Sequence, residues 1–152
     1  MKKRFSTLYA ILGFMVLAGL FILYQYPQWY VSSDQQELLK RARLEVGNQV
    51  AGQTVTITYA TLPFGGFVVV RDNLGDKPGD IIGVSQYLEA GRYKSVVIKL
   101  TTPTITGQTL IAGVVTDDGN YRLDTKDTLL IDARGNPMIQ SFIVGTTSLP
   151  LK

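Results

Sequence analysis

Residues 54–59 read Thr-Val-Thr-Ile-Thr-Tyr, with an apolar or aromatic side chain at every second position. Side chains of a β-strand alternate between two faces, so this spacing places Val55, Ile57 and Tyr59 on one face and the threonines on the other. β-branched residues also favour extended backbone. The stretch therefore predicts a half-buried strand and indicates how the chain that follows it should be interpreted.

Short apolar or alternating runs continue to the end of the sequence and predict further strands at 67–70, 81–84, 93–100, 110–116, 129–131 and 138–144. Turn-forming residues separate them, as at Thr106-Gly107, 117–120 and 134–137. About seven short strands without intervening helices predict an all-β domain over residues 48–152, an antiparallel immunoglobulin-like β-sandwich. Because the chain has no Cys and its one Trp is Trp29, "immunoglobulin-like" describes the architecture alone.

A short stalk helix is expected before this domain, over residues 34–46 of a juxtamembrane segment at 27–47. Ser33 can cap its first turn, and Gly47 supplies a stop. We interpret its apolar face as packing on the domain or on the bilayer surface, with a self-association seam as the alternative. That face carries Leu38, Leu39, Ala42 and Val46.

The first part of the chain has the pattern of a membrane anchor. Residues 5–26 are almost wholly apolar and hold no Asp, Glu, Lys or Arg. About 20 helical residues rise about 30 Å, the thickness of the bilayer hydrocarbon core. Residues 5–26 are therefore predicted to form a transmembrane signal anchor, with cleavage of a signal peptide near Val31-Ser32-Ser33 as the alternative. Aromatic residues that suit the membrane interface follow the run, namely Tyr24, Tyr26, Trp29 and Tyr30.

Charge at the N-terminus predicts the orientation of this anchor. Lys2, Lys3 and Arg4 form a basic tail at residues 1–4, which favours a cytoplasmic N-terminus and a translocated C-terminal domain. The expected location is thus the cell membrane, single-pass, with the C-terminal domain outside the cytoplasm and the lipid bilayer as one partner.

Composition excludes several classes of function. With no Cys and no His, the chain can form no disulfide, no Cys/His zinc site and no catalytic triad based on His. The net charge of +3 equals the three charges of the basic tail, since 12 acids offset 12 of the 15 Lys and Arg residues. The domain itself is therefore not expected to bind nucleic acid. No cofactor is expected.

Three ordered strings resemble an uncharacterised domain family of archaeal and some bacterial surface or secreted proteins. They are LPFGGFVVVRD at 62–72, IGVSQYLEAG at 82–91 and QTLIA at 108–112. The resemblance covers about residues 50–146, and it implies a secreted or membrane-tethered β-sandwich module without established catalytic residues. The chain departs from the salt-loving members of the family in lacking their acidic excess, and in having 114–116 as Val-Val-Thr where they tend to carry a Pro-His pair.

The same strings have structural interpretations. We expect Gly65 and Gly66 to supply positive φ at a turn into a strand, and Gly83 to mark a bulge or a close backbone approach. The turns of the family motifs are assigned to Pro63, Gly65, Gly66, Gly83 and Gly91.

Candidate sites of other kinds are interpreted as structural. Ser85 lacks the second Gly and the His of a nucleophile elbow, so no catalytic residue is assigned, although a Ser-Lys pair with Lys94 or Lys99 is conceivable. The acids around Gly119 are expected to form a hairpin rather than a calcium site, so no metal ligand is assigned. These residues are Asp117, Asp118, Asn120, Asp124 and Asp127. A binding patch of strand tyrosines is a further alternative to packing at a sheet edge, and it would use Tyr59, Tyr87, Tyr93 and Tyr121.

The function predicted from these observations is that of a membrane-anchored, non-catalytic module outside the cytoplasm. It would bind or scaffold another cell-envelope component, with an envelope protein or a glycan as the partner. One alternative is an accessory subunit of a membrane protein complex, in which the anchor packs against partner helices. A second is an enzyme of unknown class.

Overall fold

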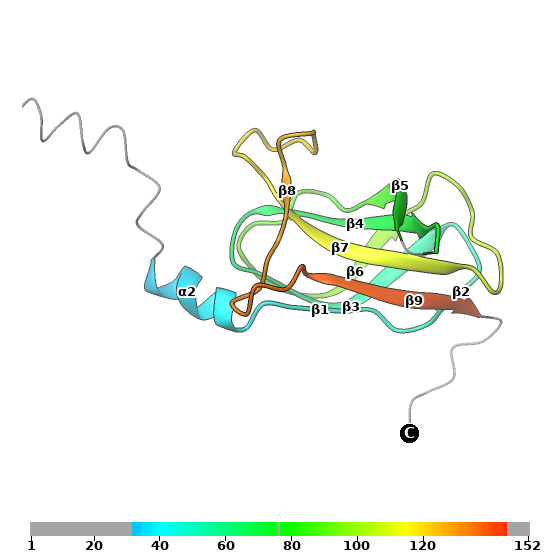
Figure 1. Ribbon diagram of the computed structural model, residues 1–152, viewed down its shortest axis with the longest axis horizontal. Coiled ribbons are helices and arrows are strands. Elements are labelled where there is room, and N and C mark those ends of the chain that lie inside the picture. The colour runs from blue at the N-terminus through cyan, green and yellow to red at the C-terminus, as the bar shows by residue number, and fades with distance from the viewer. Residues whose placement is uncertain (1–31, 76, 146–152) are drawn as a thin grey trace, which may run out of the picture. The chain divides into compact units, whose positions relative to one another are not determined.

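The computed structural model describes residues 32–75 and 77–145. The chain divides into two compact units, Met1–Ser32 and Ser33–Lys152, and the description below concerns the second unit. This unit begins with one helix, α2 (Ser33–Lys40), and continues as strands arranged in two sheets (Figure 1). The all-β prediction for this domain is confirmed.

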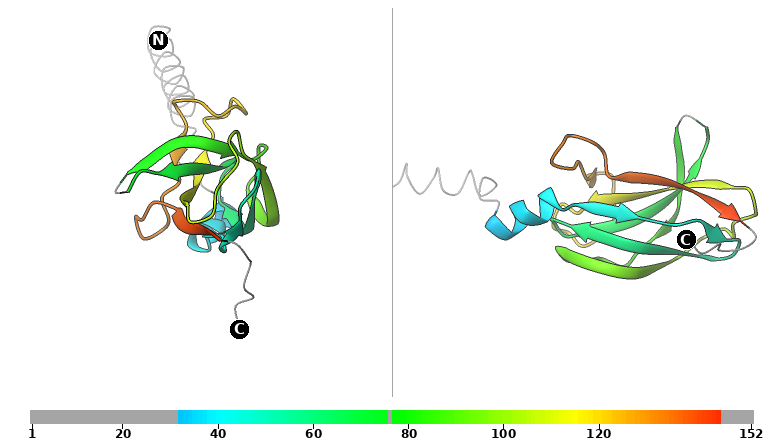
Figure 2. Two further views of the ribbon diagram at one scale, coloured as in Figure 1. Left: turned by 90° about the vertical axis from the view of Figure 1, so that its right-hand side faces the viewer. Right: turned by 90° about the horizontal axis from the view of Figure 1, so that it is seen from below.

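The smaller sheet has three strands in the order β1-β3-β6, and the larger has six, ordered β2-β9-β7-β4-β5 with β8 paired to β7. Seen end-on, the strands form two layers (Figure 2). Each of the expected strands is present. The strands are β1 (Arg43–Glu45), β2 (Gln49–Val50), β3 (Thr54–Leu62), β4 (Gly66–Asn73), β5 (Pro78–Val84), β6 (Gly91–Lys99), β7 (Thr109–Thr116), β8 (Thr128–Leu129) and β9 (Ile139–Gly145).

The stalk helix is shorter than predicted. It ends at Lys40, and residues 43–45 form β1, which pairs antiparallel with β3 from Arg43↔Thr61 to Glu45↔Tyr59. The 3.6-residue spacing that suggested a continuous helix is overridden because Leu44 packs against the core and Val46 lies inside it. The sheets therefore begin at Arg43 rather than after residue 48.

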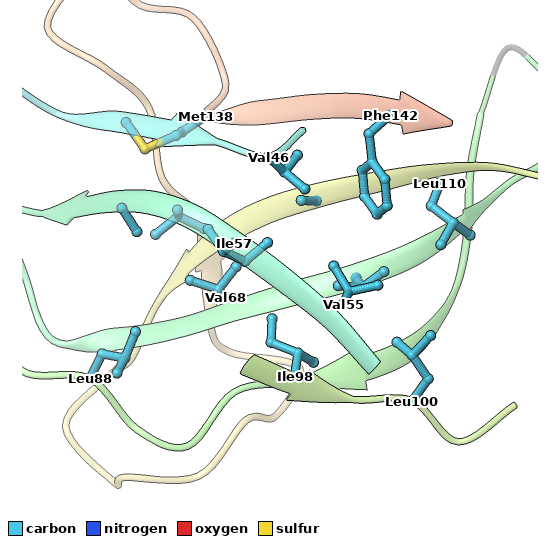
Figure 3. Close-up of a cluster of buried hydrophobic side chains, with 14 of the residues drawn as sticks. Val46, Val55, Ile57, Val68, Leu88, Ile98, Leu100, Leu110, Met138 and Phe142 are labelled. Carbon is cyan, nitrogen blue, oxygen red and sulfur yellow. The ribbon is translucent and has the colours of Figure 1, made fainter. Parts of the chain in front are cut away.

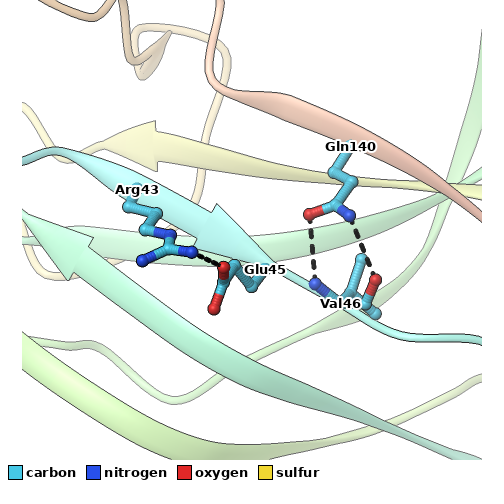
Figure 4. A network of polar contacts seen from close by, with 4 residues as sticks. All are labelled: Arg43, Glu45, Val46 and Gln140. Atoms are coloured by element: carbon cyan, nitrogen blue, oxygen red, sulfur yellow. Dashed lines mark hydrogen bonds and ion pairs between the residues drawn. The ribbon is translucent and has the colours of Figure 1, made fainter. Parts of the chain in front are cut away.

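The sandwich is also not antiparallel throughout, because β2 pairs parallel with β9. A side-chain amide helps to join the two sheets at this edge (Figure 4). The Gln140 Oε1 atom accepts a hydrogen bond from the Val46 N–H, and its Nε2 donates to the Val46 carbonyl oxygen, both at 3.1 Å. Gln140 on β9 thus completes the backbone hydrogen bonding of the chain just after β1.

The smaller sheet changes face in mid-strand. Ile57 and Ile98 point into the core, but further along β3 the core side chains are Ala60 and Leu62, three and five residues after Ile57, so the alternation has shifted by one residue. The change falls where Ser95, with φ of 54°, stands between the paired positions of β3 and β6. Tyr59 therefore does not share the core face of Ile57, and that prediction is wrong.

The core fills the space between the two sheets (Figure 3). Val55, Ile57 and Ile98 reach in from the smaller sheet, and Val68 and Phe142 from the larger. All five are 3% exposed or less, so the hydrophobic interior rests on side chains from both layers. Across residues 32–75 and 77–145, no helix is long and apolar enough to cross a membrane. The predicted anchor at 5–26 lies outside the described residues.

Candidate functional site

The outer face of the larger sheet is apolar, although it does not face the main core. Strand β4 is buried on both sides, because Val68 and Val70 enter the core while Phe67 and Val69 point outward. The outward side chains form a second cluster with Val115, on which Leu123 and Tyr87 pack. We call the outward side chains of this sheet the apolar face, made up of Phe67, Val69, Val84, Ile111, Val115, Leu129, Ile139 and Ile143.

A cleft of about 340 Å³ opens in the apolar face. Strand register sets its floor, since Val69 on β4 lies opposite Gly113 on β7, and Gly113 lies opposite Ile139 on β9. A Cβ atom at Gly113 would lie 3.4 Å from the side chains of Ile139 and Leu129. The absence of a side chain at Gly113 therefore leaves space in the floor of the cleft between these two residues. Polar groups occur at the border of the cleft, at Arg71, Asp124 and Asp127.

Several aliphatic side chains of the apolar face are open to solvent. Ile143 is 52% exposed, Ile139 45%, Leu129 40% and Val84 36%. Scattered exposed aliphatic residues are ordinary on proteins, but Leu129 and Ile139 both line the cleft, and an open apolar patch at a cleft is typical of an interaction surface. Val84 and Ile143 lie on the same sheet face outside the cleft. The arrangement can bind an apolar partner surface, and it brings together no set of side chains suited to acid–base or nucleophilic catalysis.

The acidic loop at 117–127 borders the cleft and brings three of the five suspected metal ligands together. The carboxylate oxygens of Asp117, Asp118 and Asp127 lie within 4.8 Å of one another. Two of the oxygens already accept hydrogen bonds within the loop. Asp117 Oδ2 accepts one from the Gly119 N–H at 2.8 Å, and Asp127 Oδ1 accepts one from the Asp118 N–H at 3.1 Å. The second Asp117 oxygen is buried without a hydrogen-bond partner.

The other two suspected ligands bind each other. The Asn120 amide donates to the Asp124 carboxylate at 2.9 Å. The pKa of Asp124 is lowered, first because its carboxylate accepts a hydrogen bond from the Lys126 backbone N–H and then because of Asn120. These contacts stabilise the loop without a cation.

Calcium is expected to leave the stability of this domain unchanged. Most carboxylate oxygens of the loop already accept hydrogen bonds from backbone N–H groups, and Asp117 Oδ1, which accepts none, would be a single ligand. A cation would therefore have to compete with hydrogen bonds already formed. The melting temperature should therefore be the same in calcium and in chelator, and calorimetric titration should show no binding. Micromolar binding that an Asp117→Asn, Asp118→Asn double variant abolishes would contradict the expectation.

Ser85 and the tyrosines have structural roles. The Ser85 hydroxyl donates to the Gln86 carbonyl at 2.7 Å and accepts from Val68 N–H at 3.0 Å, which leaves it engaged with backbone. Tyr87 stacks edge-on against Phe67 and against Tyr121, with ring centroids 5.6 and 4.8 Å apart. Burial first, and then the Glu89 carboxylate, raise the pKa of Tyr87, so its hydroxyl stays protonated.

The four tyrosines do not form one patch. Tyr59 and Tyr93 belong to the smaller sheet, where Tyr93 packs against the core and its hydroxyl donates to the Glu89 carbonyl at 2.9 Å. Tyr87 and Tyr121 lie on the side of the larger sheet, with Phe67.

The residues assigned to motif turns serve close packing more than turn geometry. Gly65 and Gly66 do not have positive φ, so that prediction is wrong: a Cβ at Gly65 would overlap the Tyr87 hydroxyl, and one at Gly66 the Val115 carbonyl oxygen. The close approach predicted at Gly83 is confirmed, because a Cβ there would lie 2.7 Å from the Leu100 side chain. Gly83 on β5 also forms an isolated antiparallel β-bridge with Leu100, the residue that follows β6.

The other two residues assigned to motif turns are Pro63 and Gly91. Pro63 is fully buried at the end of β3. Gly91 opens β6, and a Cβ there would make only ordinary contact with Tyr93. The topology and interface residues lie outside the described residues, namely Lys2, Lys3, Arg4, Tyr24, Tyr26, Trp29 and Tyr30.

The sequence interpretation missed the apolar face, although a signal was present. Residues 66–70 form an unbroken apolar run, and a strand without alternation is typical of burial on both faces. The signal for the apolar face is this lack of alternation, rather than the strand itself.

A model of the family described as "Domain of unknown function (DUF7282)" matches residues 42–144, more than half of the chain. The chain belongs to this family.

One curated protein is similar to part of this chain. A cell surface glycoprotein, "Cell surface glycoprotein 2" of Haloarcula hispanica, is 38% identical over 74 residues, which is 48% of this chain and 8% of the relative. The matched segment is thus a small part of that relative, which is a much longer protein. No solved structure matches.

Proposed function

We propose that the chain is a membrane-anchored, non-catalytic module outside the cytoplasm, which binds another cell-envelope protein through the apolar face. The observation that carries the proposal is the pair of solvent-open aliphatic side chains at the cleft in the larger sheet, Leu129 and Ile139, with Val84 and Ile143 open on the same sheet face. The similarity to a cell surface glycoprotein supports the surface location. Residues 5–26 would be the single-pass anchor, with the basic tail in the cytoplasm, and the architecture is best described as immunoglobulin-like.

A protein surface suits the apolar face better than a sugar does. Sugars are bound by planar arrays of polar groups and aromatic rings, whereas the open side chains here are aliphatic. Burying Leu129, Ile139 and Ile143 together would remove three partly exposed aliphatic groups from water, a stabilising change for the complex. No nucleic acid is expected as a partner, as the sequence predicted.

The experiment uses intact cells and a crosslinker that does not pass the membrane. Wild-type chain should give a crosslinked product with a second envelope protein. Ile143→Arg, which places a charge in the apolar face, should reduce that product about tenfold.

Val97→Arg is the matched control, because Val97 is an equally open aliphatic residue, 62% exposed, on β6 of the other sheet. It should keep the product. Equal loss in the two variants would overturn the proposed binding face, and a wild-type chain that stays unlabelled in intact cells would overturn the proposed location.

A further inference from the structure

A second hollow, of about 720 Å³, lies at the end of the domain where α2 finishes. Residues 39–42 and β1 border it on one side, the outer surface of β3 and β6 forms its floor, and the turn at 132–134 closes it. Figure 1 shows this turn beside the last turn of α2. We call this hollow the basic pocket.

Cationic side chains outnumber acids around the basic pocket. Its acids are Glu45 and Asp132, and its cations are Lys40, Arg41, Arg43, Arg92 and Arg134. Such an excess of fixed positive charge attracts an anion and disfavours a neutral or cationic ligand.

The two acids offset only two of these five positive charges. Glu45 pairs with Arg43. The Asp132 carboxylate accepts hydrogen bonds from the backbone N–H groups of Arg134 and Asn136, each at 2.8 Å, and these bonds lower its pKa, that from Asn136 most. Arg41 pairs outside the pocket, with Glu37 at 3.0 Å. Among the described residues, Lys40, Arg92 and Arg134 have no ion-pair partner.

Strand register places two of the arginines on either side of one floor residue. Thr61 on β3 lies directly opposite Arg43 on β1 and directly opposite Arg92 on β6, so all three share a sheet face. Strands are spaced by about 4.8 Å, so the two arginine backbones stand about 10 Å apart across Thr61. Arg43 is paired with Glu45, so of these two arginines Arg92 is the one without an ion-pair partner among the described residues. An anion beside Thr61 would therefore be attracted mainly by Arg92.

Arginine side chains at this spacing favour phosphate. A guanidinium group presents paired N–H donors that match two oxygens of a phosphate. Arg92 and Arg134 form no ion pair among the described residues, although Arg134 lies close enough to Asp132 to help lower the pKa of that carboxyl. The hollow is larger than a bare phosphate requires and falls in the range of small-molecule sites. We propose that the basic pocket binds the phosphate group of a larger molecule, a lipid headgroup or a soluble phosphate ester.

The lipid source rests on the proposed anchor, whereas the soluble source does not. Nine residues separate Tyr30, at the expected membrane interface, from Leu39 at the pocket. Nine residues span at most about 30 Å when fully extended, so an anchored chain would hold the basic pocket within that reach of the headgroups.

The test uses the full chain in micelles of an uncharged, phosphate-free maltoside detergent and follows backbone amide signals of residues 39–43, 92 and 132–134 by NMR. In one arm glycerol phosphate is added, and in the other phosphatidylglycerol is added to the micelles. Saturable shifts at these amides are expected in at least one arm, and the arm that responds identifies the source. Higher salt should weaken the response.

The variant Arg92→Gln with Arg134→Gln should weaken the binding at least about tenfold, because it removes the two unpaired guanidinium groups. Arg122→Gln with Lys126→Gln removes the same charge from the exposed loop at 117–127 and should leave binding unchanged. No shift in either arm, or equal weakening by the two double variants, would overturn the proposal. Because the readout is local to the pocket, its failure would leave the crosslinking result at the apolar face untouched.

Discussion

A chain cut to residues 48–152 should be largely unfolded, whereas a chain cut to residues 33–152 should unfold cooperatively. The shorter chain lacks β1, so the edge of β3 loses its partner from Arg43 to Glu45. It also lacks Val46, 5% exposed in the core, and Leu44, which packs against it. Each buried aliphatic side chain contributes about 1.5 to 3 kcal/mol, and their loss would remove much of a domain stability of about 5 to 15 kcal/mol.

The amide of Gln140 adds to this loss, since its two hydrogen bonds to Val46 would have no protein partner. Urea unfolding followed by far-ultraviolet circular dichroism would measure the difference. A chain cut to residues 42–152 is the matched control, because it removes α2, which buries no residue, and keeps β1. It should retain the stability of the 33–152 chain to within about 1 kcal/mol. Equal stability of the 42–152 and 48–152 chains would show that β1 does not hold the core together.

Much of the strand pattern could be predicted because it is local. The alternation at 54–59 and the apolar runs that follow it gave β3 to β9, and positive φ at Gly107, Gly119 and Gly135 agrees with the turns expected there. Strand β1 was harder to predict, because residues 42–46, Ala-Arg-Leu-Glu-Val, fit two patterns. Ala42 and Val46 continue the helical spacing of Leu38 and Leu39, while the five residues also alternate like a strand. Pairing with β3 and burial of Val46 favour the strand.

The candidate sites illustrate the same limit. The basic pocket joins residues 40 to 43, 92 and 134, which are separated by tens of positions in the sequence and meet only because β1, β3 and β6 are neighbours. In the sequence, these cations are balanced by acids elsewhere, so the net charge gives no sign of a local excess. Gly65 and Gly66 were correctly singled out, but their reason is the space taken by Tyr87 and by β7 rather than their own φ angles.

Gly66→Ala should cost about 3 kcal/mol or more of the free energy of unfolding. Gly66 is crowded by backbone on two sides: it pairs with Thr116 of β7, and its N–H and carbonyl both bond to Leu88, at 2.9 and 2.8 Å. A Cβ would overlap the Val115 carbonyl oxygen, and that atom belongs to a strand in the middle of the larger sheet. Relief would therefore require β4 and β7 to separate.

Two other glycines provide graded controls, measured by urea unfolding of the 33–152 chain. Gly65→Ala should cost less than Gly66→Ala, because its Cβ meets the end of the Tyr87 side chain, which can rotate away. Gly47→Ala has nothing within 4 Å of the new atom, and it should leave stability unchanged or raise it by up to about 1 kcal/mol. If the three variants lost stability equally, the cause would be a general effect of replacing glycine. The expected order, with Gly66 most sensitive and Gly47 least, would instead identify the approach of β4 to β7 as the reason for glycine at position 66.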